Sequence, residues 1–175
     1  MKELETDRLR LRFLRMDDAD IIFRSWASSP RVAAYLSRKQ HLDLGETRKM
    51  LHRWLAFYRF SNYWRYGIER KEDGALIGTV GIVAYRKGNP LVTYVLGEEY
   101  WGNGYMTESL RAFTRELFEN GCRSVQAEVM EDNIGSNRVL QKCGFRLINS
   151  HRAPISAEKT EIVTFNIYRL KNSRR

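Results

Sequence analysis

The sequence predicts an α+β protein, an α/β sandwich in which flanking helices cover a central mixed sheet that is mostly antiparallel. Three stretches of alternating apolar residues follow one another with only short turns between them, which is typical of an antiparallel meander. A helical pattern then separates the third stretch from a fourth, and this order predicts a βαβ unit with one parallel strand pair. Because we find no internal repeat or linker, residues 1–175 are expected to form a single domain.

The N-terminal part of the chain predicts a strand and a helix. In RLRLRFL (8–14), apolar residues alternate with arginines, which indicates a strand with one buried face and one solvent-facing face. DDADIIFRSWAS (17–28) has apolar residues at helical spacing, and either Asp17 or Asp18 is suited to cap that helix. Pro30 then marks a break in the chain.

The middle of the chain predicts a long helix and the antiparallel meander. A helical stripe of apolar residues indicates a helix over 44–60. Alternating apolar positions indicate strands over 63–70, 76–85 and 91–97. The turn signals EDG and KGNP separate these strands, so we expect each strand to pair with the next.

The C-terminal part predicts two helices and three strands. An amphipathic helix is expected over 107–121, followed by a strand over 123–130. A short helix is expected over 133–144. The remaining stretch, 145–170, is expected to form two strands joined by a polar connection around Pro154.

Composition narrows the class of protein. Hydrophobic residues make up 43% of the chain, which is ordinary for a globular protein and argues against disorder. No apolar run approaches the roughly 20 residues of a membrane span, and the start MKELETDRLRLRFL lacks the apolar region of a signal peptide. The two cysteines, Cys122 and Cys143, form no disulfide framework. We therefore expect a cytoplasmic protein without a membrane partner.

The formal net charge of +9 favours an anionic partner, such as a phosphorylated cofactor, a nucleic acid or an acidic surface. The charge is scattered along the chain, apart from the tail YRLKNSRR, and a solvated basic surface explains such a distribution equally well. A nucleic acid is therefore an alternative partner here and not the expected one.

The stretch EEYWGNGYMTES (98–109) places Gly102 and Gly104 between a predicted strand and a predicted helix. The start of a helix presents unpaired N–H groups and partial positive charge, and glycines let a phosphate approach the backbone closely. The stretch lacks the Lys-Ser/Thr ending of a nucleotide P-loop and the third glycine of a dinucleotide fingerprint. The spacing therefore predicts either a phosphate-binding turn or a tight turn that binds nothing.

The segments YWGNGYMTES and EDNIGSNRVLQKCGF together resemble the two cofactor-binding segments of the GNAT superfamily of acetyl-CoA-dependent N-acetyltransferases. More narrowly, the chain resembles the RimJ/RimL-type branch, which includes ribosomal-protein N-terminal acetyltransferases. The stretches ETDRLRLR, SPRVAAYL and YWRYGIERKEDGALIGTVGI support this resemblance, which covers nearly the whole chain. It implies the GNAT fold, acetyl-CoA as co-substrate and no metal.

The resemblance also implies which residues hold the cofactor. The Leu96 backbone would serve as an oxyanion donor beside the thioester. The turn would hold the pyrophosphate and the second segment would line the other side of the cofactor; the residues implied are Leu96, Trp101, Gly102, Asn103, Gly104, Tyr105, Met106, Thr107, Asn133, Ser136 and Asn137.

Three positions depart from the superfamily pattern. Trp101 and Met106 stand at the first and last positions of the glycine motif, where Gln or Arg and Gly or Ala are usual. Since backbone N–H groups hold the phosphates, we expect both to be tolerated. Leu140 stands where many members carry a Tyr that protonates the departing thiolate. Ser136 is therefore the expected acid, although it could equally serve only as a hydrogen-bonding residue of the first helical turn.

The attacking amine must be neutral, and a general base contributes typically about 10²–10⁴-fold to the rate. Glu98 and Glu128, near the strand ends, are our candidates for this base. Glu99, Glu158 and Glu161 are further possibilities, and for every one of them a solvated surface carboxylate is the simpler explanation.

Other side chains that often mark functional sites give weaker signals. The three histidines show no metal-ligand spacing; they are His41, His52 and His151. Some aromatic residues could line the acceptor site or belong to the core; these are Trp26, Tyr35 and Trp64. Core packing is expected for Trp54 and Tyr58.

The expected function is direct transfer of acetyl from acetyl-CoA to a primary amine, with a protein or peptide N-terminus as the first choice of acceptor. A small amine, such as a polyamine or an aminoglycoside-like compound, is the alternative acceptor. A non-catalytic acyl-CoA-binding module on the same fold is an alternative function, because a Tyr at position 140 is missing. A monomer or a homodimer is expected.

Overall fold

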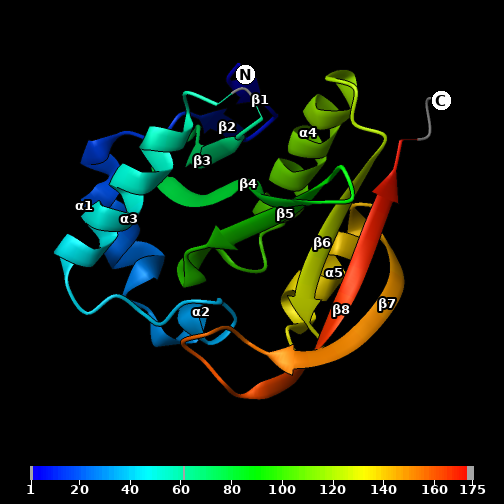
Figure 1. Cartoon of the computed structure of the whole chain (residues 1–175). Helices are drawn as coiled ribbons and strands as arrows, with labels where there is room; N and C mark the ends of the chain where they lie inside the picture. Colours follow the sequence, from blue (N-terminus) through cyan, green and yellow to red (C-terminus); the bar gives the residue numbers. More distant parts are fainter. Residues whose placement is uncertain (1, 61, 173–175) are drawn as a thin grey trace.

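The computed structural model describes residues 2–60 and 62–172 and contains one eight-stranded sheet, shown in Figure 1. The strand order is β1-β2-β3-β4-β5-β6-β8-β7, and every neighbouring pair is antiparallel except β5 and β6. The strands are β1 Leu4–Glu5, β2 Leu9–Arg12, β3 Arg65–Arg70, β4 Leu76–Arg86, β5 Asn89–Leu96, β6 Ser124–Met130, β7 Arg146–Pro154 and β8 Ile162–Lys171. The predicted mixed, mostly antiparallel sheet is confirmed.

Helices lie on both faces of this sheet (Figure 1). They are η1 Met16–Asp18, α1 Ala19–Ile22, η2 Phe23–Ala27, α2 Pro30–Ala34, α3 Leu44–Phe57, η3 Glu98–Tyr100, α4 Tyr105–Glu119 and α5 Ile134–Lys142. In β5, Tyr94 and Leu96 pack with α4 and α5, whereas Val95 packs with α1 and α3. Because successive strand residues point to opposite faces, the two groups of helices cover opposite sides of the sheet.

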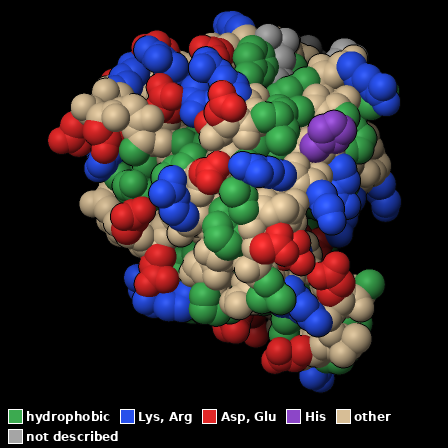
Figure 2. Space-filling view, turned by 90° about the vertical axis from the view of Figure 1, so that its left-hand side faces the viewer, with side chains coloured by type: hydrophobic (Ala, Val, Ile, Leu, Met, Phe, Trp, Pro, Cys, Tyr) green, Lys and Arg blue, Asp and Glu red, His purple; other side chains and the backbone are tan. Residues whose placement is uncertain are grey.

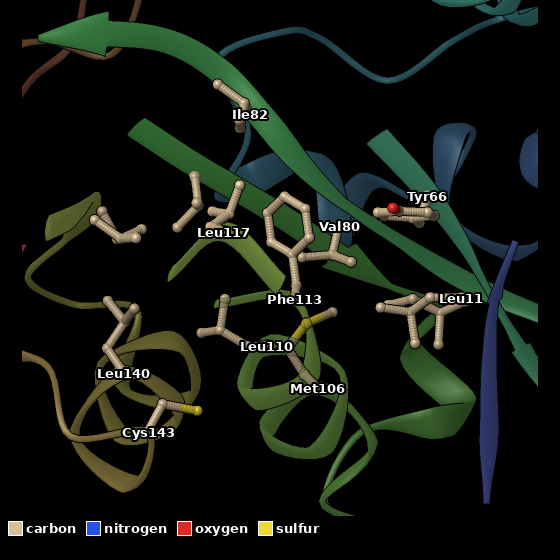
Figure 3. Close-up of a cluster of buried hydrophobic side chains, with 14 of the residues drawn as sticks. Leu11, Tyr66, Val80, Ile82, Met106, Leu110, Phe113, Leu117, Leu140 and Cys143 are labelled. Atoms are coloured by element: carbon tan, nitrogen blue, oxygen red, sulfur yellow. The ribbon is translucent and has the colours of Figure 1, made fainter. Parts of the chain in front are cut away.

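The larger core lies between α4 and the sheet. Figure 3 shows Leu110 and Phe113 of α4 pointing toward Val80 and Tyr66 of the strands. The rings of Tyr66 and Phe113 meet edge to face, with their centroids 5.9 Å apart. The amphipathic stripe predicted for this helix therefore forms the core contact, and the helix begins two residues before the predicted start, at Tyr105.

The beginning of the first helical region differs from the prediction. Neither Asp17 nor Asp18 caps a helix with its side chain, because the first turn starts after Arg15. The Asp18 carboxylate instead accepts the backbone N–H of Arg15, at 2.7 Å, and pairs with the guanidinium of Arg12, at 2.8 Å. Both partners of this ion pair are buried, so the arginine face of the predicted strand is not uniformly exposed.

Several short elements were not predicted, among them β1, η3, α2 and the π-helical form of η2. Pro30 does not break the chain, but is the first residue of α2, whose cap is the Ser29 side chain. Proline suits this position because its missing N–H would have no helical partner there. The preceding segment, η2, is a π-helix, in which the Ser28 N–H bonds the Phe23 carbonyl, and α1 and η2 together occupy the predicted 17–28 helix.

Candidate active site

The parallel strands β5 and β6 separate part-way along their length. They pair only at Leu91 with Gln126 and at Val92 with Ala127. Beyond these positions β5 continues beside β4 and β6 continues beside β8. We call the separated strand ends, residues 93–96 and 128–130, the fork. Their facing backbone edges are not paired with each other.

The end of β5 directs a backbone donor into the fork. Gly97 donates its N–H to the Ile77 carbonyl of β4, at 2.9 Å. Since backbone groups of successive strand residues point to alternate edges, the Leu96 N–H points away from β4 and toward the fork. The Leu96 carbonyl on that side accepts the indole N–H of Trp101, at 3.1 Å. The donor assigned to Leu96 from the sequence therefore has a suitable orientation.

The glycine turn lies between the fork and α4. Gly102 and Gly104 have φ angles of +78° and +79°, a backbone region that disfavours side chains. This requirement alone explains both glycines. Gly104 is the N-cap of the 15-residue helix α4 and supplies no side-chain cap, so the first N–H groups of α4 have no capping oxygen from it. A ligand anion would supply such an acceptor.

The side chains of the turn leave its backbone accessible. Met106 is 5% exposed and points into the core beside Leu110, as Figure 3 shows. Its bulk is therefore directed away from the turn. The Asn103 side chain donates to the carbonyls of Tyr100 and Trp101, at 3.3 and 3.0 Å, and so holds the turn in shape.

Arg8 contacts this turn and was not identified from the sequence. Its guanidinium donates to the Asn103 carbonyl, at 3.1 Å, and lies 4.6 Å from the centre of the Tyr105 ring. It also pairs with Glu108 in the first turn of α4, at 2.7 Å. Burial disfavours the charge of Glu108, but hydrogen bonds from Thr6 and Arg8 outweigh it and lower the pKa of this carboxyl. The turn is thus fixed to the N-terminal strands.

The second predicted cofactor segment forms α5. The Asn133 side chain caps the helix by accepting the Ser136 N–H, at 3.1 Å. The carbonyl of Ser136 accepts the hydroxyl of Tyr94 from β5, at 3.2 Å, so this bond joins β5 to α5 across the fork. Burial raises the pKa of the Tyr94 phenol well above its usual range. Tyr94 was not singled out from the sequence, although it alternates with Leu96 on one strand.

Two residues of this segment have buried side chains, Asn137 and Leu140. Asn137 is buried, and its amide donates to the carbonyls of Met130 and Asn133, at 3.0 and 2.8 Å. Its oxygen accepts from Asn166 and Tyr168, at 3.1 and 2.9 Å. The Asn137 side chain therefore has a structural role. Leu140, at the position of the usual Tyr, is fully buried and lies near Cys143 in Figure 3.

The carboxylates predicted as bases lie in different surroundings. Glu98 pairs with Arg31 of α2, whose guanidinium lies 5.8 Å from the centre of the Trp101 ring. Three others are exposed; they are Glu99, Glu158 and Glu161. Glu128 is the first β6 residue beyond the last β5–β6 pair, so it is the one that lies in the fork.

Glu128 is partly enclosed, with 16% of its side chain exposed. Arg86 of β4 forms an ion pair with its Oε2, and His151 of β7 places Nε2 at 3.6 Å from its Oε1. Oε2 is buried against Arg86, and this close ion pair lacks the alignment of a hydrogen bond.

The aromatic residues considered for an acceptor site are mostly in the interior. Trp26 is fully buried, and Trp64 is 8% exposed. Tyr35, directly after α2, is 40% exposed. Trp54 and Tyr58 pack at the sheet, where Trp54 lies under the Arg65 guanidinium and the Tyr58 hydroxyl donates to the Arg65 carbonyl.

Residues 2–60 and 62–172 contain no group of three or more His, Cys, Asp or Glu side chains that could hold a metal ion. No described helix is both long enough and apolar enough to span a membrane.

The family of the chain follows from its match to a known domain. Residues 8–146 match the model described as an acetyltransferase (GNAT) domain, which is most of the chain. The chain belongs to the GNAT acetyltransferase family. It is 33% identical over 146 residues to the uncharacterized N-acetyltransferase YoaA of Bacillus subtilis (strain 168), and this match covers 82% of each protein. The predicted family and enzyme class, a GNAT N-acetyltransferase, are confirmed.

Solved structures confirm the GNAT fold. The ribosomal L7/L12 α-N-protein acetyltransferase RimL, in complex with coenzyme A, superposes with a TM-score of 0.87 at 19% identity, covering 99% of this chain and 100% of that one. The ribosomal-protein-S5-alanine acetyltransferase of Vibrio fischeri superposes with a TM-score of 0.80 at 17% identity, covering 99% and 98%.

Proposed function

We propose that this GNAT enzyme transfers an acetyl group from acetyl-CoA directly to a primary amine, within the RimJ/RimL-type branch. The observation that carries the proposal is the fork beside the glycine turn. The N–H groups at the start of α4 suit the pyrophosphate, and the unpaired edge of β5 suits the pantetheine arm. RimL was solved with coenzyme A, which supports the same cofactor here. The residues proposed to contact it are Leu96, Trp101, Gly102, Asn103, Gly104, Tyr105, Thr107, Asn133 and Ser136.

In this proposal the fork also supplies the chemistry. The Leu96 N–H stabilises the negative charge that develops on the thioester oxygen. Glu128 takes a proton from the amine, because it is the predicted carboxylate that lies in the fork. Ser136, at the start of α5, hydrogen-bonds the departing thiolate. Glu98 is the weaker candidate for the base, because it follows the end of β5 and lies outside the fork.

We infer that the preferred acceptor is the α-amine of a protein or peptide. An α-amine with a pKa near 8 is already about a tenth neutral at pH 7, whereas a lysine amine is neutral only about once in a thousand. The net charge of +9 disfavours a highly cationic polyamine. The face that carries α1, α2 and α3 mixes acidic and basic side chains (Figure 2), and this face offers no broad basic surface for nucleic acid.

The cofactor part of this proposal is tested at Gly104. Gly104→Asp adds a negative charge at the start of α4, so acetyl-CoA affinity should fall by at least about tenfold, which corresponds to about 1.4 kcal/mol. The matched control is Gly104→Asn, which has nearly the same shape and the same need for positive φ but no charge. If calorimetry finds equal acetyl-CoA affinity for the two variants, the turn is not part of the cofactor site.

The acceptor is tested by a screen that follows release of free thiol from acetyl-CoA. Peptides with a free N-terminus should be acetylated faster than peptides that are N-terminally blocked but contain lysine. Mass spectrometry locates the acetyl group. Preference for spermidine or an aminoglycoside over every peptide would contradict the inferred α-amine acceptor and indicate a small amine instead. Cofactor binding without transfer to any amine would favour a non-catalytic acyl-CoA-binding module.

A further inference from the structure

Glu128 and His151 form a contact at the fork that leads to the protein surface. Glu128 lies on β6, opposite Ile167 of β8, and His151 lies on β7, opposite Phe165. Val129 packs in the core with α4 and α5, so its neighbour Glu128 points to the opposite face of the sheet. The 3.6 Å contact between Glu128 Oε1 and His151 Nε2 therefore spans β8 on this face.

Two described side chains form ion-pair contacts with the Glu128 carboxylate, Arg86 and His151, and of these His151 can receive a proton from it. Arg86 has no acceptor atom and stays protonated, so it cannot relay a proton. An imidazole can both take up and release a proton near neutral pH. Exposure increases along the pair, from 16% of the Glu128 side chain to 38% of the His151 side chain. The contact thus connects an enclosed carboxylate to solvent through a titratable group.

The His151 ring is held in place for this role. It stacks on Phe165, with the ring centroids 5.8 Å apart and the planes at 24°. The charged groups that the strand register brings to this face are Glu128 of β6, Arg86 of β4, Arg169 and Lys171 of β8, and Arg146 of β7, which lies opposite Arg169.

We propose that His151 is a proton relay that carries the amine proton from Glu128 to solvent. This inference rests on the proposed function. The amine nitrogen forms a bond to the thioester carbon, the carbon–sulfur bond breaks, and its electron pair leaves on the sulfur. The proton lost by the nitrogen passes to the Glu128 carboxylate. Side-chain rotation then shortens the 3.6 Å separation from His151 to hydrogen-bond distance, and the proton passes to the imidazole and from there to water. His151 touches neither substrate nor cofactor, so it is a positioning and relay residue and not a catalytic one.

The test compares His151→Gln with His52→Gln, a control at an exposed histidine on α3. At low buffer concentration, His151→Gln should lower kcat by about tenfold or more, which is less than the roughly 10²–10⁴-fold that a general base itself contributes. The KM for acetyl-CoA should stay unchanged. Added imidazole should restore part of the rate of His151→Gln, and the pH dependence of kcat should shift in this variant. His52→Gln should match the wild type in all of these measurements.

A double variant separates a relay from a structural role. Glu128→Gln together with His151→Gln should be no slower than Glu128→Gln alone, because the two residues act in series. Additive losses, or a His151→Gln enzyme with wild-type kcat and no response to imidazole, would overturn the relay. If His151→Gln folds poorly, His151→Asn is measured in the same way. A wild type that binds acetyl-CoA but acetylates no amine gives a different result, which contradicts the proposed function itself.

Discussion

At the scale of single residues, the buried charges decide where the chain departs from its simple hydrophobic pattern. Alternation assigns Arg12 to the solvent side of its strand, yet only 9% of it is exposed. Asp18 and Glu69 both accept from its guanidinium, and the hydrogen bond that Arg12 donates to Asp18 is the largest cause of the raised pKa of Arg12. Asp18 lies six residues from Arg12, outside the alternating pattern of the strand, and Glu69 lies on another strand. The sequence alone therefore reveals neither partner.

Removing this partner should be costly. Asp18→Ala leaves the Arg12 guanidinium buried with Glu69 but without the second carboxylate that balances its charge. The free energy of unfolding should therefore fall by about 3–5 kcal/mol. The control is Asp20→Ala, since Asp20 pairs with Arg48 while more than half of each side chain is exposed. That change should cost less than about 1 kcal/mol. Urea denaturation of both variants makes the comparison, and equal midpoints would contradict the importance assigned to the buried pair.

His41 provides a pH-dependent prediction at the same scale. Burial, followed by the positive charge of Arg38, lowers the pKa of His41, and its Nδ1 lies 2.7 Å from the Thr47 hydroxyl. The unfolded chain therefore binds a proton more readily than the folded chain. The stabilising contribution of neutral His41 is complete above about pH 6.5, and it is lost as the pH falls from there through the lower pKa of the folded state.

The measurement is thermal unfolding of the wild type and of His41→Gln between pH 8 and pH 5. The wild type should lose more stability than the variant as the pH falls below about 6.5. Parallel curves for the two proteins would show that His41 has the same pKa in both states.

At the scale of elements, amphipathic segments could be predicted and short irregular ones could not. The helix α4 and the strands of the meander carry clear periodicity and were found within a few residues. The π-helix η2 and the five-residue α2 are too short for periodicity to identify, and they are held by tertiary packing in the smaller core cluster, which also includes Val95. The glycine turn could be predicted because positive φ restricts the residue type. The hydrogen bond between Tyr94 and Ser136 could not be predicted, because its partners are 42 residues apart in the sequence.

The connection between β7 and β8 is fixed to α2 by one lysine. The Lys159 ammonium donates to the carbonyls of Ala33 and Leu36 at the end of α2, where the helix dipole favours a cation. Lys159→Met should therefore increase amide hydrogen exchange over residues 155–161 and over α2. Lys87→Met, in the exposed β4–β5 turn, is the control and should change neither region. Unchanged exchange in Lys159→Met would mean that this link does not hold the connection.

At the scale of the whole molecule, the sheet is continuous but has one narrow junction. Only two residue pairs join β5 to β6. The larger core crosses that junction, because α4 packs on strands from both sides of it. We therefore propose that residues 1–175 unfold as one cooperative unit, which is the behaviour expected of a single domain.

The positions of the tryptophans make this cooperativity measurable. All four lie on the N-terminal side of α4, at positions 26, 54, 64 and 101. Tryptophan fluorescence therefore reports on the part that precedes α4, whereas far-ultraviolet circular dichroism reports on the entire chain. The two urea transitions should coincide, and acetyl-CoA at 100 times its Kd should stabilise the protein by about 2.7 kcal/mol in both signals. A fluorescence transition that separates from the dichroism transition would locate a boundary at the β5–β6 junction. Stabilisation by acetyl-CoA in only one signal would restrict its contacts to one side of the fork.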